Sequence, residues 1–252
     1  MVSVGPLTDL TSIADVICGQ QNVGCVVTAE GGESGICAFG SIVNMKQHKE
    51  NIGIVALQTL LKDIVKKNGR SSKIVSRLVS SPDNVTGLLL KERLINFPPE
   101  LAPNIHRVLI DDVKWSVSDE FEPDAGESRD DYKFTHILFL STFEVEGGRE
   151  SSGPLPVHPD QQTVKEAANP PPPIANMKQK RKQDKASAKA ARIYHHWEDE
   201  MFLERAGFEH TWQNAGKPVV HRAGRKYQSF SILYGLEWED YVELVDTLPT
   251  TL

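Results

Sequence analysis

The sequence predicts an α/β (α+β) protein with a mixed sheet flanked by helices. Residues 87–115 pass from an apolar run through Pro98-Pro99 into apolar residues at helical spacing, which predicts a strand, a turn and an amphipathic helix. Residues 132–145 alternate and then become continuously apolar, as is typical of a central strand. Two segments near the start that are rich in strand-forming residues, separated by Gly31-Gly32, indicate a hairpin.

The first elements follow from periodicity. Leu7, Leu10, Ile13, Ala14 and Ile17 fall on one face, which predicts a short amphipathic helix over residues 7–19. Strands are expected at residues 23–29 and 35–43 on either side of the glycine pair.

Residues 48–68 carry apolar side chains at helical spacing and lysines near their end, where cations stabilise the helix dipole. We expect Gly69 to end this helix in the left-handed cap position. Residues 70–85 are polar and contain Ser-Ser-Pro-Asp-Asn, which predicts a loop.

In residues 87–115 the expected strand continues through Leu94 and Ile95, and the prolines stop it because proline cannot donate to a ladder. A proline in the first turn of a helix loses only an amide that has no partner there. The inward helical face is expected to hold Ile105, Val108, Leu109, Val113 and Trp115, with Asp111 and Asp112 turned outward.

Two linking segments contrast with these elements. Residues 116–131 predict an exposed acidic loop. Residues 147–191 hold a proline-rich part and then a basic part, and such a composition buries too little apolar surface to offset its ordering entropy. We therefore expect a disordered Pro-rich and basic linker at 147–191, inserted between the parts 1–146 and 192–252 of one α/β domain.

After the linker we expect a short strand at 193–197 and a helix at 198–206 with Met201, Phe202 and Arg205 inward. Glu198, Asp199 and Glu200 open this helix and are interpreted as partners of its dipole. Strands at 208–213 and 229–236 and a helix at 238–248 complete the chain.

Charge is segregated along the sequence. Residues 178–192 hold seven Lys/Arg and one Asp, a local charge of +6, so the remaining residues carry −12 because the whole chain carries −6. An acidic body attracts basic proteins at long range and repels nucleic acid backbones. A nucleic-acid binder acting through 178–192 stays open as a hypothesis, although that run has no interleaved aromatics.

The sequence predicts a protein of the nucleus and cytoplasm. No apolar run approaches the ~20 residues that span a bilayer, and the N-terminus lacks a signal-peptide layout. Cys18, Cys25 and Cys37 are odd in number, fit no zinc motif and sit in apolar contexts, so buried reduced thiols are expected.

Catalytic motifs are missing from the sequence: it contains no phosphate loop, G-x-G-x-x-G, G-x-S-x-G or H-E-x-x-H pattern. His195-His196 would point to opposite faces of the expected strand and so would not share a metal. His136 is interpreted as a hydrogen-bonded histidine at a sheet edge. We expect no catalytic residue, no cofactor and no metal.

The phrase LLLKERLINFPPELAPNIHRVLIDDVKW strongly resembles the BCCIP family of eukaryotic nuclear proteins, and the resemblance points to a fungal member. The signature residues are Glu92, Arg93, Asn96, Pro98, Pro99 and Trp115. Further similar segments are 23–27, 39–44, 132–136 and 198–200. Family members usually carry an acidic N-terminal tail and a segment rich in Phe and Asp, and the expectation is that this chain starts without them.

The resemblance implies a fold similar to that of the GCN5-related acetyltransferases. Those enzymes hold the acyl-CoA pyrophosphate on amides of a Gly-rich turn at a helix start. The corresponding turn here is Asn96-Phe97-Pro98-Pro99, where two prolines remove two amide donors. This disfavours acetyl transfer, and a degenerate acyl-CoA-dependent acyltransferase is kept as the alternative.

The resemblance also implies a function. It implies a non-enzymatic nuclear adaptor or chaperone in nuclear export and protein transport, which escorts a basic ribosomal protein for large-subunit biogenesis. Fungal relatives add links, through a lipid kinase, to actin cytoskeleton organisation and vesicular transport. Export or import receptors are further expected partners of a monomer that shuttles between nucleus and cytoplasm.

A compact basic cluster predicts nuclear targeting. It consists of Lys178, Lys180, Arg181 and Lys182, and short Lys/Arg runs are a pattern that import receptors recognise. The alternative is a charged linker that only keeps the segment extended.

Overall fold

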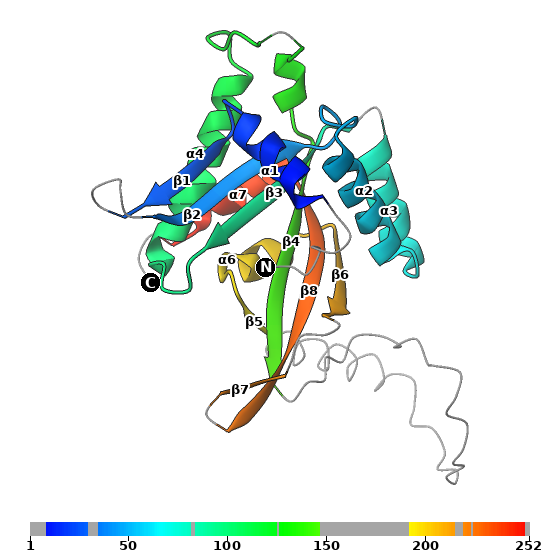
Figure 1. Cartoon of the computed structure of the whole chain (residues 1–252), viewed down its shortest axis with the longest axis vertical. Helices are drawn as coiled ribbons and strands as arrows, with labels where there is room; N and C mark the ends of the chain where they lie inside the picture. The colour runs from blue at the N-terminus through cyan, green and yellow to red at the C-terminus, as the bar shows by residue number, and fades with distance from the viewer. Residues whose placement is uncertain are drawn as a thin grey trace. The chain divides into compact units, whose positions relative to one another are not determined.

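The computed structural model describes residues 9–29, 35–81, 84–124, 126–146, 192–214, 219–222 and 224–249 (Figure 1). The elements in chain order are α1 (Leu10–Gly19), β1 (Gly24–Thr28), β2 (Ile36–Asn44), α2 (Ile52–Val65), α3 (Gly69–Ser80), β3 (Thr86–Arg93), η2 (Pro99–Leu101), α4 (Ala102–Ser116), η3 (Arg129–Tyr132), β4 (His136–Glu146), β5 (Arg192–Tyr194), α6 (Glu198–Glu204), β6 (Phe208–Gln213), β7 (Val220–Arg222), β8 (Arg225–Glu237) and α7 (Trp238–Thr247).

The chain divides into two compact units. The larger unit comprises residues 1–142, 196–212 and 231–252, and the smaller comprises 143–195 and 213–230. The predicted linker at 147–191, with its basic cluster, lies outside the described residues, as does the predicted turn at 30–34. The division into residues 1–146, 147–191 and 192–252 therefore stays a prediction.

The larger unit contains a mixed sheet in the order β1-β2-β3-β4-β8-β6. β1 and β2 pair antiparallel, as do β2 and β3, whereas β3 and β4 are parallel. The predicted hairpin and the central position of β4 are confirmed. Since parallel strands need a crossover, the helix α4 lies between β3 and β4 in the chain.

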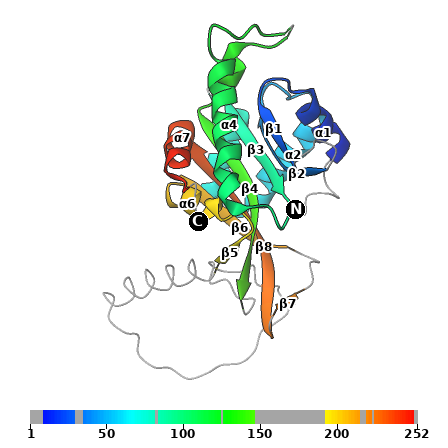
Figure 2. The ribbon, with the colours of Figure 1, turned by 90° about the vertical axis from the view of Figure 1, so that its left-hand side faces the viewer.

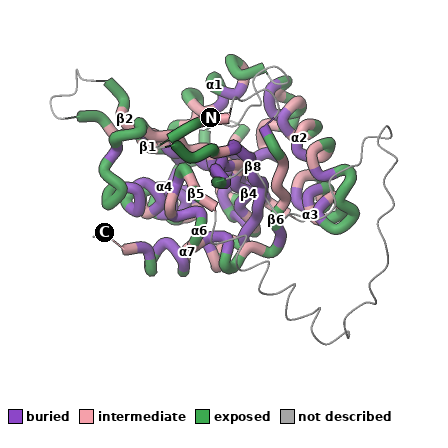
Figure 3. Tube along the Cα trace, turned by 90° about the horizontal axis from the view of Figure 1, so that it is seen from below, coloured by how far each residue is buried: buried purple, intermediate pink, exposed green. Residues whose placement is uncertain are grey.

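Helices cover both faces of this sheet (Figure 2). α4, α6 and α7 lie on one face, and α1 and α2 on the other. Along β3 the side chains alternate: Leu88 joins the core with α1–α3, while Leu89 pairs with Phe139 of β4. Along α2, α3 and α7, buried residues alternate with more exposed ones (Figure 3), as expected of helices that pack with one face inward. The alternation along β3 puts Lys91, two residues after Leu89, on the α4 side.

α3 occupies part of the segment that was predicted to be a loop, and that prediction is wrong. The Asn68 side chain accepts a hydrogen bond from the Ser71 amide at 3.3 Å and begins the helix. Val75 and Leu78 are buried against the α1–α2 core. Gly69 therefore opens a helix instead of capping one, and its φ is not positive.

The ends of β3 and the faces of α4 also differ from expectation. β3 stops at Arg93, and Ile95 is fully exposed in the turn that follows. Val108 and Trp115 are exposed on α4, whereas His106 is buried. Helical spacing alone does not separate adjacent stripes of one helix, which explains these exchanges.

His136 begins β4, which lies between β3 and β8, so the expected position at a sheet edge is wrong. Its predicted hydrogen bond is present, because its Nδ1 lies 3.0 Å from Thr135 Oγ1. Asp111 is exposed as expected, but the half-buried Asp112 accepts a hydrogen bond from the Gly24 amide at 3.2 Å.

In the smaller unit the end of β4 pairs antiparallel with β5, and β7 pairs antiparallel with β8. β5 stops at Tyr194, so it is shorter than the predicted strand 193–197. β7 was not predicted. Arg222 of β7 forms an ion pair with the buried Glu144 of β4 at 2.9 Å.

Candidate functional site

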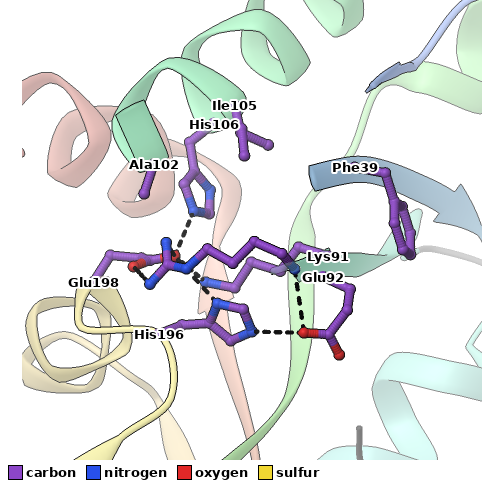
Figure 4. Close-up of a pocket in the computed structure, with 9 residues that line it drawn as sticks. Phe39, Lys91, Glu92, Ala102, Ile105, His106, His196 and Glu198 are labelled. Carbon is purple, nitrogen blue, oxygen red and sulfur yellow. Dashed lines mark hydrogen bonds and ion pairs between the residues drawn. The ribbon is translucent and has the colours of Figure 1, made fainter. Parts of the chain in front are cut away.

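A buried cluster of charged side chains lies between β3, α4 and α6 in the larger unit (Figure 4). Lys91 Nζ donates to Glu198 Oε1 at 2.8 Å and to Asp199 Oδ1 at 3.0 Å. The Glu198 side chain is 1 % exposed and the Asp199 side chain 0 %. Lys91 therefore bridges two carboxylates that have almost no access to water. The charged and titratable side chains around this bridge are called the Lys91 cluster and comprise Lys91, Glu92, Arg93, His106, His196, Glu198 and Asp199.

Two more cationic or polar groups reach Glu198. Arg93, two residues further along β3, places Nη2 3.2 Å from Glu198 Oε2. His106 of α4 places Nε2 3.5 Å from Glu198 Oε1, and its Nδ1 lies 2.8 Å from the Tyr241 hydroxyl. Two elements that are separate in sequence, β3 and α4, thus converge on one carboxylate of α6.

Asp199 is held from the sheet side. The Ser141 hydroxyl of β4 donates to Asp199 Oδ2, and the Tyr234 hydroxyl of β8 donates to Oδ1 at 2.7 Å. Tyr234 also stacks on Phe139 at 4.7 Å between ring centroids. The polar bonds are therefore enclosed by aromatic rings that exclude water.

Burial and charge shift the pKa values in this cluster. Burial raises the pKa of Glu198, but Lys91, His106 and Arg93 outweigh it and hold that pKa well below its usual range. Burial, with Lys91, lowers the pKa of His106. The carboxylate is thus charged and the histidine neutral near neutral pH.

His196 lies at the rim of the cluster and was expected on a strand, but β5 ends before it. Its Nδ1 lies 3.9 Å from Glu198 Oε1, and its Nε2 lies 4.0 Å from Glu92 Oε1. Burial, with Lys91, lowers its pKa to about 4. The Nδ1 atom is buried and has no hydrogen-bond partner among the described residues.

A cavity of about 10 Å³ adjoins the cluster; its walls include Phe39, Ala102 and Ile105 as well as the charged residues (Figure 4). About one water molecule fits such a volume. Tyr241, His106 and Glu198 form a chain along which a proton can in principle pass, yet the cavity has no room for a substrate beside it. The arrangement is best explained as a polar network that fixes β3, α4 and α6 together.

The structure brings only part of the predicted signature into this cluster. Glu92 and Arg93 belong to it, whereas Asn96 and Pro98 are exposed in the turn after β3. The Pro99 carbonyl accepts a hydrogen bond from Trp197 Nε1 at 3.2 Å. Trp115 packs on Phe121 with ring centroids 5.1 Å apart.

Glu198, Asp199 and Glu200 lie in the first turn of α6, as expected of partners of its dipole. That interpretation is incomplete, because Glu198 and Asp199 are also buried and ion-paired, and only Glu200 is exposed. Met201 is half-buried and Arg205 exposed, while Phe202 is buried as expected. Sequence reasoning missed Lys91, His106, Ser141, Tyr234 and Tyr241. The charges Lys91 and Arg93 that directly follow the apolar run of β3 were the available signal, because a charge carried into the core requires a partner.

In the described part of the chain Cys18 is exposed, and Cys25 and Cys37 are half-buried, so the expectation that all three thiols are buried is wrong. There, three or more His, Cys, Asp or Glu side chains nowhere gather in a way that could hold a metal ion. The helices in those ranges are too short or too polar to cross a membrane.

Known proteins resemble this chain over most of its length. The family model described as BCCIP matches residues 4–202. The protein named bcp1 from Aspergillus fumigatus is 28% identical over 200 residues, which cover 79% of this chain and 58% of that protein. The BCCIP homolog of Arabidopsis thaliana is 23% identical over 230 residues, covering 91% of this chain and 61% of that protein.

A solved structure shares the fold. The crystal structure of BCP1 from Saccharomyces cerevisiae aligns with a TM-score of 0.60 at 18% identity and covers 99% of this chain and 77% of that one. A second fungal relative, bcp1 from Aspergillus oryzae, is 32% identical over 133 residues, which cover 53% of this chain and 43% of that protein. The chain thus spans between 43% and 61% of the length of these sequence relatives.

Proposed function

Because the chain belongs to the BCCIP family, we propose that it is a non-enzymatic nuclear adaptor or chaperone. In this proposal it takes part in nuclear export and protein transport and escorts a basic ribosomal protein for large-subunit biogenesis. Links to the actin cytoskeleton and to vesicular transport, through a lipid kinase, are secondary parts of the proposal. The chain spans only part of its relatives, so the proposal concerns what this part contributes.

The observation that carries the proposal is the closed Lys91 cluster. A cluster of shifted carboxylates and histidines commonly marks an active site. Here Lys91 and Arg93 already neutralise Glu198 and Asp199, and the adjoining cavity measures only about 10 Å³. Packing of this kind supports a structural role for the cluster, and with it a function by surface recognition.

Charge supports a basic client. The chain outside residues 178–192 carries −12, and exposed carboxylates are found on the 116–131 segment and on α7. Complementary charge speeds encounter with a basic protein and disfavours anionic partners. A ribosomal protein, which must neutralise RNA phosphates, has the required positive surface.

The alternative, a degenerate acyltransferase on an acetyltransferase-like fold, needs a turn that can bind a diphosphate. In the turn after β3, Pro98 and Pro99 supply no amide donors, and the Phe97 side chain is buried at 8% exposure. The Phe97 amide already donates to the Leu94 carbonyl at 3.0 Å. These contacts disfavour acyl-CoA binding at this turn.

Nuclear targeting is assigned in this proposal to Lys178, Lys180, Arg181 and Lys182. Changing Lys180, Arg181 and Lys182 to Ala is expected to move a fluorescent fusion from the nucleus to the cytoplasm. A control that loses the same charge elsewhere is Lys49, Lys66 and Lys67 changed to Ala, which is expected to stay nuclear. Nuclear concentration of the first variant, with unchanged folding, would show that the protein enters with a partner.

Affinity capture from nuclear extract, followed by mass spectrometry, tests the proposed function. At low salt we expect basic large-subunit ribosomal proteins to be enriched on this chain, compared with an unrelated control bait of similar net charge. Enrichment of anionic partners only, or of no protein above the bait control, would count against the adaptor. A longer form of the protein should be captured in parallel, because the relatives extend beyond the region matched here.

A further inference from the structure

A surface groove runs beside α7 where this helix lies along the end of α4. Figure 2 shows the two helices side by side, and Arg107 of α4 donates to the Leu248 carbonyl after α7 at 3.2 Å. The groove has a volume of about 350 Å³. It is lined by Lys114, Trp238, Glu239, Val242, Glu243 and Asp246. All of these residues belong to the larger unit.

The floor and the rim of this groove differ in chemistry. Trp238 and Val242 are half-buried and supply the apolar floor. Trp238 is fixed from behind, since its amide donates to the Thr135 carbonyl at 3.0 Å and its ring lies 5.9 Å from that of Phe134. The rim consists of exposed carboxylates and one lysine. An apolar floor with a charged rim suits a side chain that is apolar along its stem and charged at its tip.

The carboxylates on the rim are incompletely neutralised. Arg205 forms ion pairs with Glu243 at 2.6 Å and with Asp240 at 3.5 Å, so it neutralises part of the charge of these two carboxylates of α7. Within the part of the chain that the structure describes, neither Glu239 nor Asp246 has an ion-pair partner. α7 itself contains four carboxylates and no cation. This contrasts with the Lys91 cluster, where each buried carboxylate already has a cation.

We propose that the groove is the docking surface for a Lys/Arg-rich segment of a protein partner. The aliphatic stem of one lysine or arginine lies on Trp238 and Val242, and its cationic head meets Glu239 or Asp246. Arginine and lysine bind favourably over a tryptophan face, and more so where the contact is partly desolvated. An anionic segment would face uncompensated carboxylates. This inference rests on the proposed function, because it locates the contact surface of the basic client.

Two charge-matched variants of the whole chain test the location. The groove variant is Glu239→Lys with Asp246→Lys. The control variant is Glu120→Lys with Glu122→Lys, which makes the same charge change on exposed residues of the 116–131 segment. The probe is a labelled Lys/Arg-rich peptide, whose binding is followed by fluorescence anisotropy. A matching peptide with Glu in place of Lys and Arg shows whether binding depends on positive charge.

We expect the groove variant to bind the basic peptide about tenfold more weakly and the control variant to change it by less than about twofold. A third variant, Val242→Asn, keeps the charge and is expected to weaken binding through the floor alone. Urea unfolding of each variant checks that α7 remains folded. Equal weakening by the two charge variants would mean that only net charge matters, and this would overturn the groove as the docking surface.

The chain's own basic segment is another possible occupant. If changing Lys180, Arg181 and Lys182 to Ala tightens peptide binding, the groove belongs to that segment and the proposed partner is overturned. The groove and the function fail in different ways. If the unaltered chain captures a basic ribosomal protein and the groove variant captures it equally well, only the groove is rejected as the docking surface. If the unaltered chain captures no basic protein, the proposed function itself is rejected.

Discussion

Lys91 on β3 and Glu198 at the start of α6 lie 107 positions apart in the chain, yet their side chains meet at 2.8 Å. The contact joins the central strand of the family signature to the acidic turn that follows residues 147–191. Asp199 shares the same lysine, so Lys91 ties two successive residues of α6 to β3.

Loss of the shared cation should be costly. Lys91→Met keeps much of the side-chain volume but leaves Glu198 and Asp199 buried without their main partner. We expect the free energy of unfolding to fall by roughly 3–5 kcal/mol, measured by urea denaturation. Lys133→Met, which removes an exposed pair with Asp130 at 2.7 Å, should leave stability nearly unchanged. Equal stability of the two variants would show that the cluster is not structural.

Stability should fall in acid partly through His196. Its pKa is about 4 when folded against 6.5 as the ordinary value, so the unfolded chain binds its proton more readily. Its contribution is present in full above pH 6.5 and is lost as the pH falls towards 4, at about 1.4 kcal/mol per pH unit. His196→Gln should reduce this slope, measured as urea stability against pH, whereas the exposed His221→Gln should not. An unchanged slope in His196→Gln would contradict the assigned burial.

Close packing within the sheet should make Gly87 intolerant of a methyl group. A Cβ there would lie 2.6 Å from Ile42 Cγ2 and 2.8 Å from Ile137 Cδ1. Gly87→Ala is expected to lower the unfolding free energy by about 1–3 kcal/mol. Gly69→Ala is the matched control, because a Cβ at the start of α3 meets nothing within 4 Å. If thermal unfolding finds the two variants alike, the core near Phe134 is looser than described.

The turn after β3 should not bind acyl-CoA. Pro98 and Pro99 offer no amides, and Phe97 fills the space behind them. We expect no heat of binding when acetyl-CoA is titrated to millimolar concentration in a calorimeter. A dissociation constant in the low micromolar range, about −8 kcal/mol, would favour the acyltransferase alternative.

The sequence predicted those parts of the fold that local pattern determines. The β1–β2 hairpin, β3, α4, β4 and α7 follow from periodicity and from the proline and glycine positions. α3 was missed because its serines and charges outnumber its apolar residues, and only Val75 and Leu78 among its apolar side chains are fully buried. Its stability comes from packing on α2, which sequence pattern does not reveal.

The candidate site was less predictable, for a different reason. Lys91 and Arg93 on a strand of the core indicate that anionic partners must exist, but not where in the chain these partners lie. His106 and Tyr241 gave no signal of their own, since both occupy ordinary positions on amphipathic helices. Their roles arise only when α4 and α7 pack on the same face of the sheet.

Recognition of a basic ribosomal protein by the acidic chain is tested most directly by an association rate. Stopped flow measures this rate with purified basic large-subunit ribosomal proteins at increasing salt. At least one such protein is expected to bind, with an on-rate that falls steeply towards 1 M salt, where the screening length is ~3 Å. An on-rate that does not change between low salt and 1 M, or the failure of every basic ribosomal protein to bind, would contradict this expectation.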